Sequence, residues 1–362
     1  MITVVIPTYN RSNLLNRAIQ SVLDQTFQDR CIIVMDNNSS DDTSVVVNKY
    51  IANGEKIKYI CNETNLGGLK NFYLGINEVE TDYYCLLSDD DFLLPSFMEK
   101  IMEGFKDPEV MFSCAKTIIA DLPRDSIFYR NQDWDTGFYY PSNKIICKTF
   151  NSHFTSTGVV FKKEVRSIIG PFDVGGTDVL YLTFAAASFK FYVADYYGAV
   201  FTVHKLSYTN SGGISSEAEE RLFEIIKDTL NEVTKLQINN EKKVLLSKLI
   251  LDYYMPVLRV NKCTIDKEFS ISGVEVENDW RCLKINKYEL IIGVFKLLPN
   301  FTKPISKIVA NYINSIIKLK EKRWFKLNGV PISKNIRPTL EFNKSEFLII
   351  EKWVQSQKFI KK

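Results

Sequence analysis

The sequence predicts an α/β protein in which a mostly parallel, doubly wound sheet is followed by a helical C-terminal region. First, short apolar runs alternate with helix-like segments through about the first 120 residues, as in proteins with parallel sheets. Second, the apolar run 83–87 leads through Ser88 into three consecutive carboxylates, Asp89, Asp90 and Asp91. Third, long helical patterns replace the strand-like runs after Ser216.

Each element expected in the first part of the chain has a local signal. Strands are expected where apolar runs are short and continuous, and helices where apolar residues recur three and four positions apart. Pro7 closes the first strand, and Pro95 suits the first turn of a helix. In order, we expect strands over 2–6, 31–35, 57–61, 83–87 and 110–120, and helices over 14–23, 43–52, 69–79 and 95–105.

The middle of the chain is less regular. Residues 121–154 show little periodicity and are rich in aromatic side chains. We expect a long, ordered loop that faces a ligand, or else a small satellite core. Next we expect a strand over 155–161, a helix over 163–169, a glycine-rich turn over 170–178, a helix from Val179, and strands over 191–195 and 198–203 that end at His204.

The C-terminal region combines helical patterns with positive charge. From Lys284 onward there are 17 Lys and Arg against 5 Glu, a net of +12, whereas the preceding residues carry a net of −9. We expect one domain over 1–215 and a helical, basic region over 216–362. Its expected helices cover 217–236, 241–259, 287–298 and 304–320, with an irregular segment over 260–284.

The basic tail has two interpretations. The helix expected over 304–320 has an apolar face beside several lysines and is followed by Trp324 and Phe325. It could lie on an anionic membrane surface, or its lysines could only confer solubility. No recognisable nucleic-acid-binding module accompanies the charge, so we expect no nucleic-acid partner.

The cysteines and the apolar stretches argue against a disulfide-rich, zinc-binding or membrane-spanning protein. Seven cysteines occur without a C-x-x-C pair, and several lie inside apolar runs. This pattern predicts buried thiols in a reducing compartment, instead of disulfides or a zinc site. The first strand has no basic segment before it, and no apolar stretch approaches about 20 residues. We therefore expect neither a signal peptide nor a transmembrane helix.

Polar side chains follow several of the expected strands. Residues 7–11 follow the first strand, Asp36 and Asn37 follow the second, and Asp89–Asp91 follow the fourth, while Lys70 lies near a helix start. Ligands bind at this edge of an open α/β sheet. Three adjacent carboxylates repel one another unless a cation lies among them, and a divalent metal with a phosphorylated ligand would supply it. Each loop alone could equally be a turn or a helix cap.

Four motifs together resemble those of the family 2 glycosyltransferases. They are Pro-Thr-Tyr-Asn from residue 7, Asp-Asn-Asn-Ser-Ser-Asp-Asp-Thr from 36, Asn-Leu-Gly-Gly-Leu-Lys-Asn from 65 and Ser-Asp-Asp-Asp-Phe-Leu-Leu-Pro from 88. The resemblance covers about residues 1–210. It implies a GT-A fold over 1–215, a nucleotide-diphosphate-sugar donor, a divalent metal (Mn²⁺ or Mg²⁺) and inversion at the anomeric carbon.

The resemblance also implies roles for individual residues. The commoner family motif is Asp-x-Asp-Asp, and Ser88 stands at its first position, which leaves the exact metal ligands open. His204 could alternatively be a strand-end histidine without a role. The implied nucleotide-sugar-binding residues are Pro7, Thr8, Tyr9, Asn10, Arg11, Asp36, Asn37, Asn65, Lys70 and Asp89, and the implied metal ligands are Asp90, Asp91 and His204.

Two further residues bear on donor and acceptor. An amide at Asn37 can donate to the cytosine N3 or accept from uracil or thymine, so UDP-, CDP- and dTDP-sugars all fit. Asp178 matches the family's catalytic base, which takes the proton of the acceptor hydroxyl; it could instead cap its helix. His153 has no motif around it and is expected to be structural.

Together these observations predict a metal-dependent, inverting glycosyltransferase of bacterial surface polysaccharide (O-antigen, lipopolysaccharide or capsule) synthesis. We expect a glycan acceptor that is lipid-linked, and a cytoplasmic location, peripheral on the cytoplasmic face of the inner membrane. One alternative is a sugar nucleotidyltransferase, although residues 7–11 lack the glycine- and lysine/arginine-rich phosphate loop it would need. The other is a non-catalytic scaffold that binds a nucleotide-sugar or a membrane.

Overall fold

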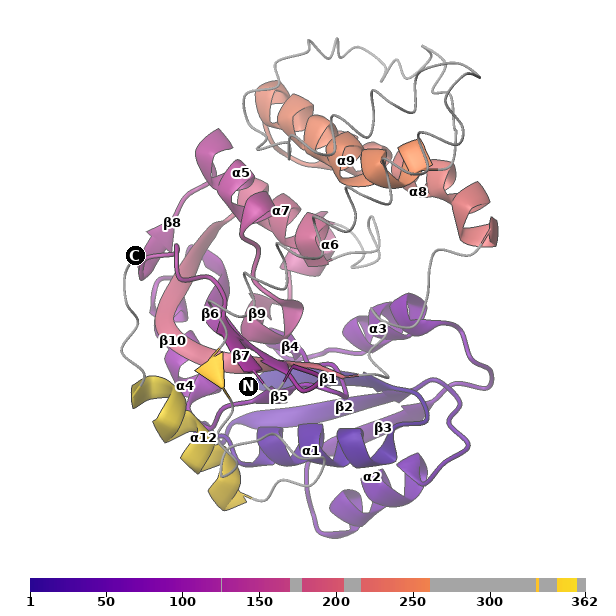
Figure 1. Ribbon diagram of the computed structural model, residues 1–362, viewed down its shortest axis with the longest axis vertical. Coiled ribbons are helices and arrows are strands. Elements are labelled where there is room, and N and C mark those ends of the chain that lie inside the picture. The colour runs from indigo at the N-terminus through magenta and orange to yellow at the C-terminus, as the bar shows by residue number, and fades with distance from the viewer. Residues whose placement is uncertain (125, 170–177, 205–215, 261–329, 332–343, 357–362) are drawn as a thin grey trace. The chain divides into compact units, whose positions relative to one another are not determined.

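The computed structural model describes residues 1–124, 126–169, 178–204, 216–260, 330–331 and 344–356 (Figure 1). The chain divides into two compact units. Met1–Leu246 and Pro331–Lys362 form the first, and Ser247–Val330 forms the second. The helices expected over 287–298 and 304–320, with Trp324 and Phe325, lie outside the described residues.

The first half of the central sheet is parallel. Strands β1 (Ile2–Thr8), β2 (Arg30–Asp36), β3 (Ile57–Cys61) and β4 (Tyr83–Leu86) lie in the order β4-β1-β2-β3. β1 pairs in parallel with β2 and β4, and β2 pairs in parallel with β3. These are the four strands that the apolar runs predicted, to within two residues at each end.

Helices cover both faces of this parallel half, as expected of a doubly wound sheet. α1 (Ser12–Leu23) and α2 (Thr43–Ala52) lie on one face, and α3 (Gly68–Asn77) lies on the other (Figure 1). α1 turns Leu15, Ile19 and Val22 towards the sheet, where each is fully buried in the main core. Their spacing of three and four residues is the signal that predicted this helix.

The second half of the sheet is mixed. β4 pairs antiparallel with β9 (Val159–Lys162), and β9 pairs antiparallel with β6 (Val110–Asp121). β6 also pairs antiparallel with β7 (Ser126–Tyr129) and in parallel with β10 (Lys190–Val203). β10 is one long strand where two were expected. Register shifts between Val193 and Ala199 let it continue past the predicted break.

The segment 121–154 is not the long loop that its weak periodicity predicted. It contains β7, β8 (Gly137–Tyr139) and α5 (Asn143–Asn151). The Trp134 side chain is fully buried, and its ring packs 4.9 Å from that of Tyr139 and 5.2 Å from that of Phe154. Trp134 is therefore part of a small satellite core, which was the alternative prediction for this segment. Phe138 and Tyr140 remain exposed.

The remaining described elements connect or flank these strands. No helix among the described residues is long and apolar enough to cross a membrane. The remaining elements are β5 (Phe92–Leu93), α4 (Phe97–Met102), the 3₁₀ helices Glu103–Lys106 and Ser156–Gly158, α6 (Val165–Ile169), α7 (Asp178–Ser188), α8 (Ser216–Lys235), α9 (Asn240–Val260), β11 (Val330–Pro331) and α12 (Lys344–Ser356).

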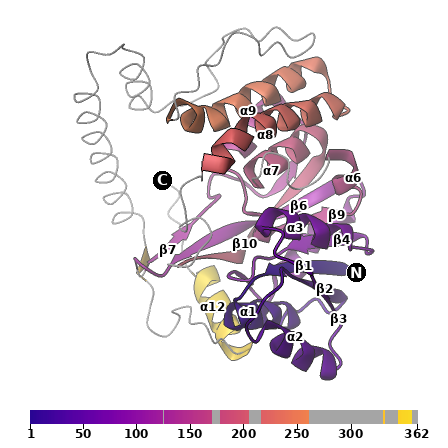
Figure 2. The same cartoon turned by 90° about the vertical axis from the view of Figure 1, so that its right-hand side faces the viewer.

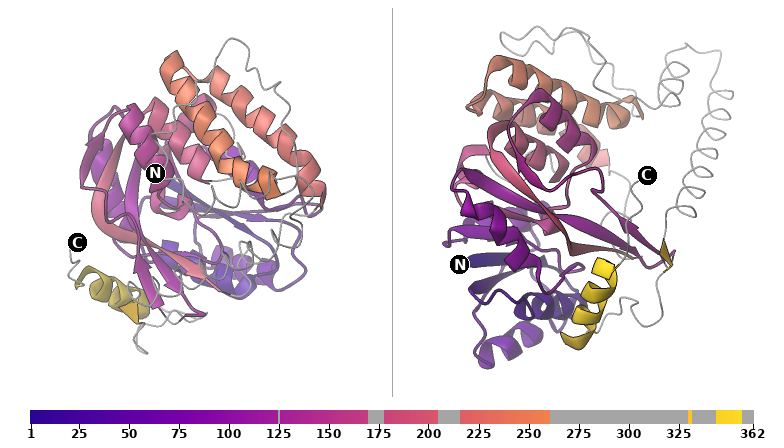
Figure 3. Two further views of the ribbon diagram at one scale, coloured as in Figure 1. Left: turned by 45° about the horizontal axis from the view of Figure 1, so that its top comes forward. Right: turned by 90° about the vertical axis from the view of Figure 1, so that its left-hand side faces the viewer.

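The C-terminal helix α12 belongs to the first unit and packs beside α1 and β10 (yellow in Figures 2 and 3). The Phe347 ring is buried 5.5 Å from the Phe92 ring. Glu351 Oε1 accepts hydrogen bonds from the Ser96 amide, at 2.8 Å, and from the Tyr196 hydroxyl. The division into a domain over 1–215 and a basic region over 216–362 stays a prediction. The structure adds that part of the second segment contacts the first.

A glycine sets the distance between α3 and the sheet. A Cβ atom at Gly75 would lie 2.5 Å from Val5 Cγ1 and 2.6 Å from Met35 Cγ. Such separations are well inside van der Waals contact, so a side chain at this position would push α3 away from β1 and β2. The close approach keeps the turn before α3 near the carboxyl ends of both strands.

We predict that Gly75→Ala lowers the free energy of unfolding by about 1–3 kcal/mol, because the added methyl group overpacks this contact. Gly68→Ala, on the same helix with nothing within 4 Å of the added Cβ, should leave it unchanged or raise it by less than about 1 kcal/mol. Urea denaturation measures both. Equal effects of the two substitutions would contradict the packing assigned to Gly75.

Candidate functional site

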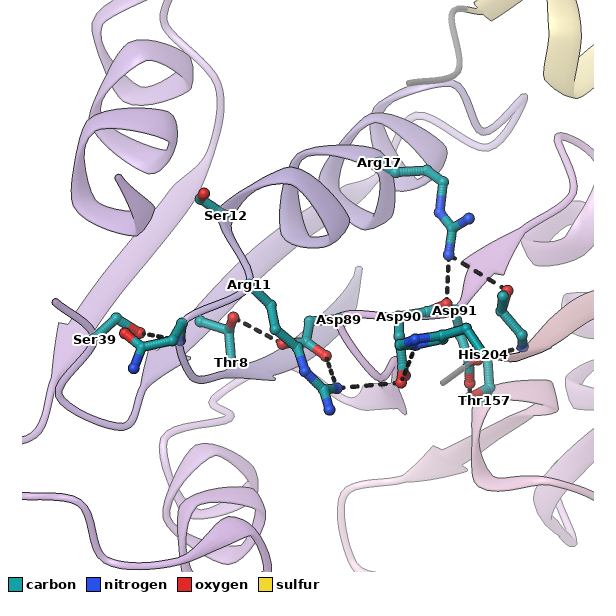
Figure 4. A network of polar contacts seen from close by, with 12 residues as sticks. Thr8, Arg11, Ser12, Arg17, Ser39, Asp89, Asp90, Asp91, Thr157 and His204 are labelled. Atoms are coloured by element: carbon teal, nitrogen blue, oxygen red, sulfur yellow. Dashed lines mark hydrogen bonds and ion pairs between the residues drawn. The ribbon is translucent and has the colours of Figure 1, made fainter. Parts of the chain in front are cut away.

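The carboxyl ends of β1, β2 and β4 meet at one edge of the sheet, because these strands are parallel neighbours. Thr8 ends β1, Asp36 ends β2, and the three carboxylates follow β4 within a few residues. His204 follows the end of β10 and reaches the same place. Figure 4 shows the resulting network of polar contacts among Thr8, Arg11, Asp89, Asp90 and His204.

Asp89 is a buried carboxylate held by two groups from the first loop. Its Oδ2 accepts from Thr8 Oγ1 at 2.8 Å, and its Oδ1 accepts from Arg11 Nη1 at 3.1 Å. Burial, and then the charge of Asp90, raises the pKa of Asp89 to about 6, while Arg11 and Thr8 oppose this shift. Thr8, Arg11 and Asp89, which were all predicted to bind the nucleotide-sugar, are therefore in direct contact.

Asp90 contacts both the Arg11 guanidinium and the His204 imidazole. Its Oδ2 is 3.1 Å from Arg11 Nη1 and 3.1 Å from His204 Nε2. Arg11 therefore bridges Asp89 and Asp90, which relieves part of the repulsion between adjacent carboxylates. Asp90 and His204 are thus brought together, and their role as metal ligands stays a prediction.

Asp91 has a different environment from its two neighbours. It is fully buried, and both of its oxygens accept hydrogen bonds, Oδ2 from Thr157 Oγ1 at 2.7 Å and Oδ1 from the Thr202 amide at 2.9 Å. Burial, and then Asp90, raises the pKa of Asp91 above its usual range. We infer that Asp91 fastens the acidic loop to the 3₁₀ helix and to β10, while its role as a metal ligand stays a prediction.

Arg17 is a site residue that the sequence reasoning missed. It lies on α1 and is fully buried, and its Nη2 donates to the Asp90 carbonyl and, at 3.3 Å, to Thr202 Oγ1. Its Cζ lies 5.1 Å from the centre of the Phe92 ring. Burial lowers the pKa of Arg17 to about 10, and the charge of Asp91 is the largest opposing influence. A charged residue inside the apolar face of a predicted helix was the available signal.

The residues expected to read the base form a second network. Asp36 Oδ2 accepts from the Tyr59 hydroxyl at 2.6 Å, and its Oδ1 accepts from the Ser39 amide at 2.9 Å. Asn37 Nδ2 donates to Asn65 Oδ1 at 2.7 Å, and Asn37 Oδ1 accepts from the Leu66 amide at 2.8 Å. The loops after β2 and β3 are thus joined through Asn37. One amide hydrogen of Asn37 has no partner among the described residues.

The first loop is tied to the loop after β2. Asn10, whose φ is 51°, donates through its amide to Ser39 Oγ at 2.8 Å, and its Oδ1 accepts from the Ser40 amide at 2.7 Å. Asp41 Oδ2 accepts from the Ser12 amide at 2.9 Å. These bonds leave the Tyr9 side chain 44% exposed, so its ring is available to a ligand.

Pro7 and Lys70 lie around this edge outside these networks, whereas Asn65 is bonded to Asn37. Pro7 is buried in β1 opposite Met35 of β2. Lys70 is exposed in the first turn of α3, and Asn65 is exposed in the loop before it. No hydrogen bond joins the Lys70 side chain to Asp89 or Asp90 in the structure.

Asp178 is connected to the acidic loop through two adjacent residues. It is the first residue of α7, and its Oδ2 lies 3.4 Å from the Ser156 amide nitrogen. Thr157, the next residue along the chain, donates to Asp91. The candidate base and the acidic loop therefore lie on either side of one short 3₁₀ helix.

The donor set around Asp90 can hold a divalent metal. Among the described residues no group of three His, Cys, Asp or Glu side chains is arranged as a ready-made metal site. Asp90 and His204 nevertheless present an oxygen and a nitrogen 3.1 Å apart. Carboxylate and imidazole ligands suit Mn²⁺, and a phosphorylated ligand commonly completes the coordination of such ions. The two side chains therefore fit the group, with Asp89 beside them.

Comparison with known proteins identifies the class. Residues 3–168 match the model of the family described as glycosyl transferase family 2. The fold is similar to that of S. aureus TarS 1-349 in complex with UDP-GlcNAc, with a TM-score of 0.58, 15% identity, and coverage of 99% of this chain and 93% of that one. The segment 3–168 is a family 2 glycosyltransferase domain, and its fold is GT-A, as the resemblance predicted.

Two relatives by sequence match only part of this chain. The GalNAc(5)-diNAcBac-PP-undecaprenol beta-1,3-glucosyltransferase of Campylobacter jejuni is 38% identical over 109 residues, which are 29% of this chain and 35% of that protein. Chondroitin synthase of Escherichia coli is 25% identical over 156 residues, which are 42% of this chain and 22% of that protein. This chain therefore spans well under half of the length of either relative.

We predict that Asp91→Ala lowers the free energy of unfolding by about 3–5 kcal/mol. The substitution leaves the Thr202 amide and the Thr157 hydroxyl without an acceptor and removes the strongest opposing charge from buried Arg17. Asp90→Ala should change stability far less, because it also relieves repulsion between carboxylates. Urea denaturation of both variants measures this difference. Similar unfolding free energies for the two would contradict a scaffold role for Asp91.

Proposed function

We propose that this protein is a glycosyltransferase that moves a sugar from a nucleotide-diphosphate-sugar to a glycan acceptor. The observation that carries the proposal is the convergence of Thr8, Arg11 and His204 on Asp89 and Asp90. All of these except His204 lie in the segment that matches glycosyl transferase family 2. These residues come from strands far apart in sequence that share one sheet edge. A ligand with a diphosphate and a sugar suits a site with carboxylates and an arginine side by side.

On the donor side, we propose that Tyr9, Asp36 and Asn37 lie against the base and that Asp89 lies towards the ribose. Asn37 Oδ1 already accepts from the Leu66 amide and from Asn62 Nδ2. The remaining amide hydrogen of Asn37 can donate to an acceptor on uracil, cytosine or thymine, so UDP, CDP and dTDP all fit. Asp90 and His204 would hold a divalent metal, Mn²⁺ or Mg²⁺, which when bound supplies charge neutralisation for a leaving diphosphate. Arg11 keeps Asp89 and Asp90 together and adds positive charge where the diphosphate approaches.

On the acceptor side, we propose that Asp178 is the general base of an inverting displacement. The acceptor hydroxyl oxygen attacks the anomeric carbon and forms the new C–O bond. Its proton passes to the Asp178 carboxylate. The bond between the anomeric carbon and the diphosphate oxygen breaks, and the nucleoside diphosphate leaves with the electron pair. A single displacement of this kind inverts the anomeric centre.

The acceptor class is a further part of the proposal. The name of the Campylobacter jejuni relative specifies an undecaprenol diphosphate-linked glycan, and a lipid-linked acceptor would suit the basic C-terminal residues of this chain. We propose a role in bacterial surface polysaccharide (O-antigen, lipopolysaccharide or capsule) synthesis, peripheral on the cytoplasmic face of the inner membrane. Replacing Lys303, Lys307, Lys318 and Lys320 with Gln leaves the packed helix α12 in place. This variant should then lose most of its co-sedimentation with anionic liposomes, and unchanged co-sedimentation would count against the membrane role.

We predict that Asp90→Asn weakens Mn²⁺-dependent binding of UDP by more than about tenfold, since a ligand carboxylate is lost. Isothermal titration with and without Mn²⁺ measures this. Asp135→Asn removes an exposed carboxylate elsewhere on the same unit and should bind UDP as the native protein does. UDP binding by Asp90→Asn at native affinity would argue against a metal–diphosphate site at Asp90.

We predict that Asp178→Asn lowers the rate of sugar transfer by about 100- to 10,000-fold, because the amide cannot accept the hydroxyl proton. Its affinity for UDP and Mn²⁺ should remain native. The measurement is transfer from a UDP-, CDP- or dTDP-sugar panel to a lipid-linked glycan, with UDP binding in parallel. Native transfer rates in this variant would rule out Asp178 as the base.

A further inference from the structure

Two basic side chains lie beside the candidate base, and the proposed mechanism does not use them. Arg130 directly follows β7, and His153 lies between α5 and the 3₁₀ helix at Ser156–Gly158. Arg130 Nη2 is 3.5 Å from His153 Nε2. The amide nitrogen of Ser156, three residues after His153, lies 3.4 Å from Asp178 Oδ2, and the charge of Asp178 acts on both basic side chains. The three groups therefore share one small region.

The surrounding structure holds this pair in place. The Arg130 amide donates to the Thr117 carbonyl at 2.8 Å, which extends the β6–β7 pairing by one bond. The buried Asn131 donates through Nδ2 to the Ser152 and His153 carbonyls at 3.3 and 2.9 Å. Trp134 Nε1 also donates to the Ser152 carbonyl, at 2.8 Å. The backbone that carries His153 is thus fixed to the residues that follow Arg130.

The guanidinium of Arg130 has an unusual set of partners. Comparable half-buried cations of the same unit find an oxygen. Arg166 donates to the Val79 carbonyl at 3.1 Å, and Lys190 pairs with Asp107 at 2.7 Å. Among the described residues, no carbonyl or carboxylate oxygen accepts a hydrogen bond from the Arg130 guanidinium, which contacts the His153 ring at 3.5 Å.

The electrostatics follow from this arrangement. Burial lowers the pKa of Arg130, and the carboxylate of Asp178 opposes this shift without forming an ion pair with it. Burial likewise lowers the pKa of His153, which favours the neutral imidazole. A guanidinium that has lost part of its hydration, next to a neutral ring, can gain charge-assisted hydrogen bonds from an incoming oxyanion.

We propose that Arg130 and His153 form an oxyanion subsite on the acceptor side, which binds a phosphate or a carboxylate group carried by the acceptor glycan. The inference rests on the proposed function, because Asp178 marks the acceptor side only if it is the base. Arg130 offers a planar pair of donors to the oxyanion. The subsite would fix the acceptor so that its reacting hydroxyl meets Asp178, and it would favour acidic acceptors over neutral ones.

The test uses the full chain, saturated with UDP and Mn²⁺, and three probes of similar size: glucose 1-phosphate, glucuronate and glucose. Isothermal titration should give binding of the phosphate or the carboxylate probe, or of both, and none of glucose. The probe that binds identifies the oxyanion. Arg130→Gln should weaken that binding by about 10- to 100-fold, as expected for lost charge-assisted hydrogen bonds.

Arg124→Gln is the matched control, since Arg124 lies on the same hairpin and pairs with Asp121; it should bind the anions as the native protein does. Arg130→Lys keeps the charge without the planar fork and should bind with intermediate affinity, which covers the case that Arg130→Gln misfolds. UDP affinity should be native in all three variants.

Three results would overturn the subsite. They are anion binding that survives both Arg130 substitutions, no anion binding by the native protein, and a loss of UDP affinity in the Arg130 variants. A native protein that fails to bind UDP would instead count against the proposed function.

Discussion

The repulsion among three adjacent carboxylates is the constraint on which the rest of this site depends. Asp89, Asp90 and Asp91 leave β4 in succession, and each is nearly or fully buried. The fold neutralises them with two arginines of different kinds. Arg11 lies at the edge of the sheet and bridges Asp89 and Asp90, whereas Arg17 lies inside the protein and holds the backbone of Asp90. Because Arg17 already holds the backbone of the acidic loop in place, the carboxylates of Asp89 and Asp90 can interact with a ligand.

The same loop joins the two sides of the proposed reaction. Asp91 is bonded to Thr157, and the preceding residue, Ser156, contacts Asp178 through its amide. A shift of the acidic loop would therefore also move the surroundings of the candidate base. We infer that the buried bonds of Asp91 set the separation between the donor and acceptor groups, which must be accurate to within about an ångström for efficient transfer.

Much of this arrangement could be predicted from the sequence, because it follows from strand order. Apolar runs located the parallel strands, and polar residues after each strand end had to gather at one edge, as Thr8, Asp89 and Asp90 do. Contacts made by side chains from distant segments left no local pattern. Arg17 resembled an ordinary helix residue, and the threonines that bind Asp91 lie in a 3₁₀ helix and in a strand.

Other differences have the same physical origin. The aromatic segment 121–154 folds as two short strands and a helix because Trp134 is packed by residues from elsewhere, such as Phe191. His153 had no motif around it and was expected to be structural, and tertiary packing places its Nε2 3.5 Å from Arg130 Nη2. Local periodicity contains no information on such pairings.

The central claim is that the edge formed by Asp89, Asp90 and His204 binds the diphosphate of a nucleotide-sugar together with a metal. The most direct measurement is a thermal-shift panel of UDP, CDP, dTDP and GDP, each with and without Mn²⁺. Binding to the folded state alone raises the midpoint of unfolding. The account predicts a rise with at least one of UDP, CDP and dTDP that depends on Mn²⁺. A rise with GDP alone, or with no nucleotide, would contradict it.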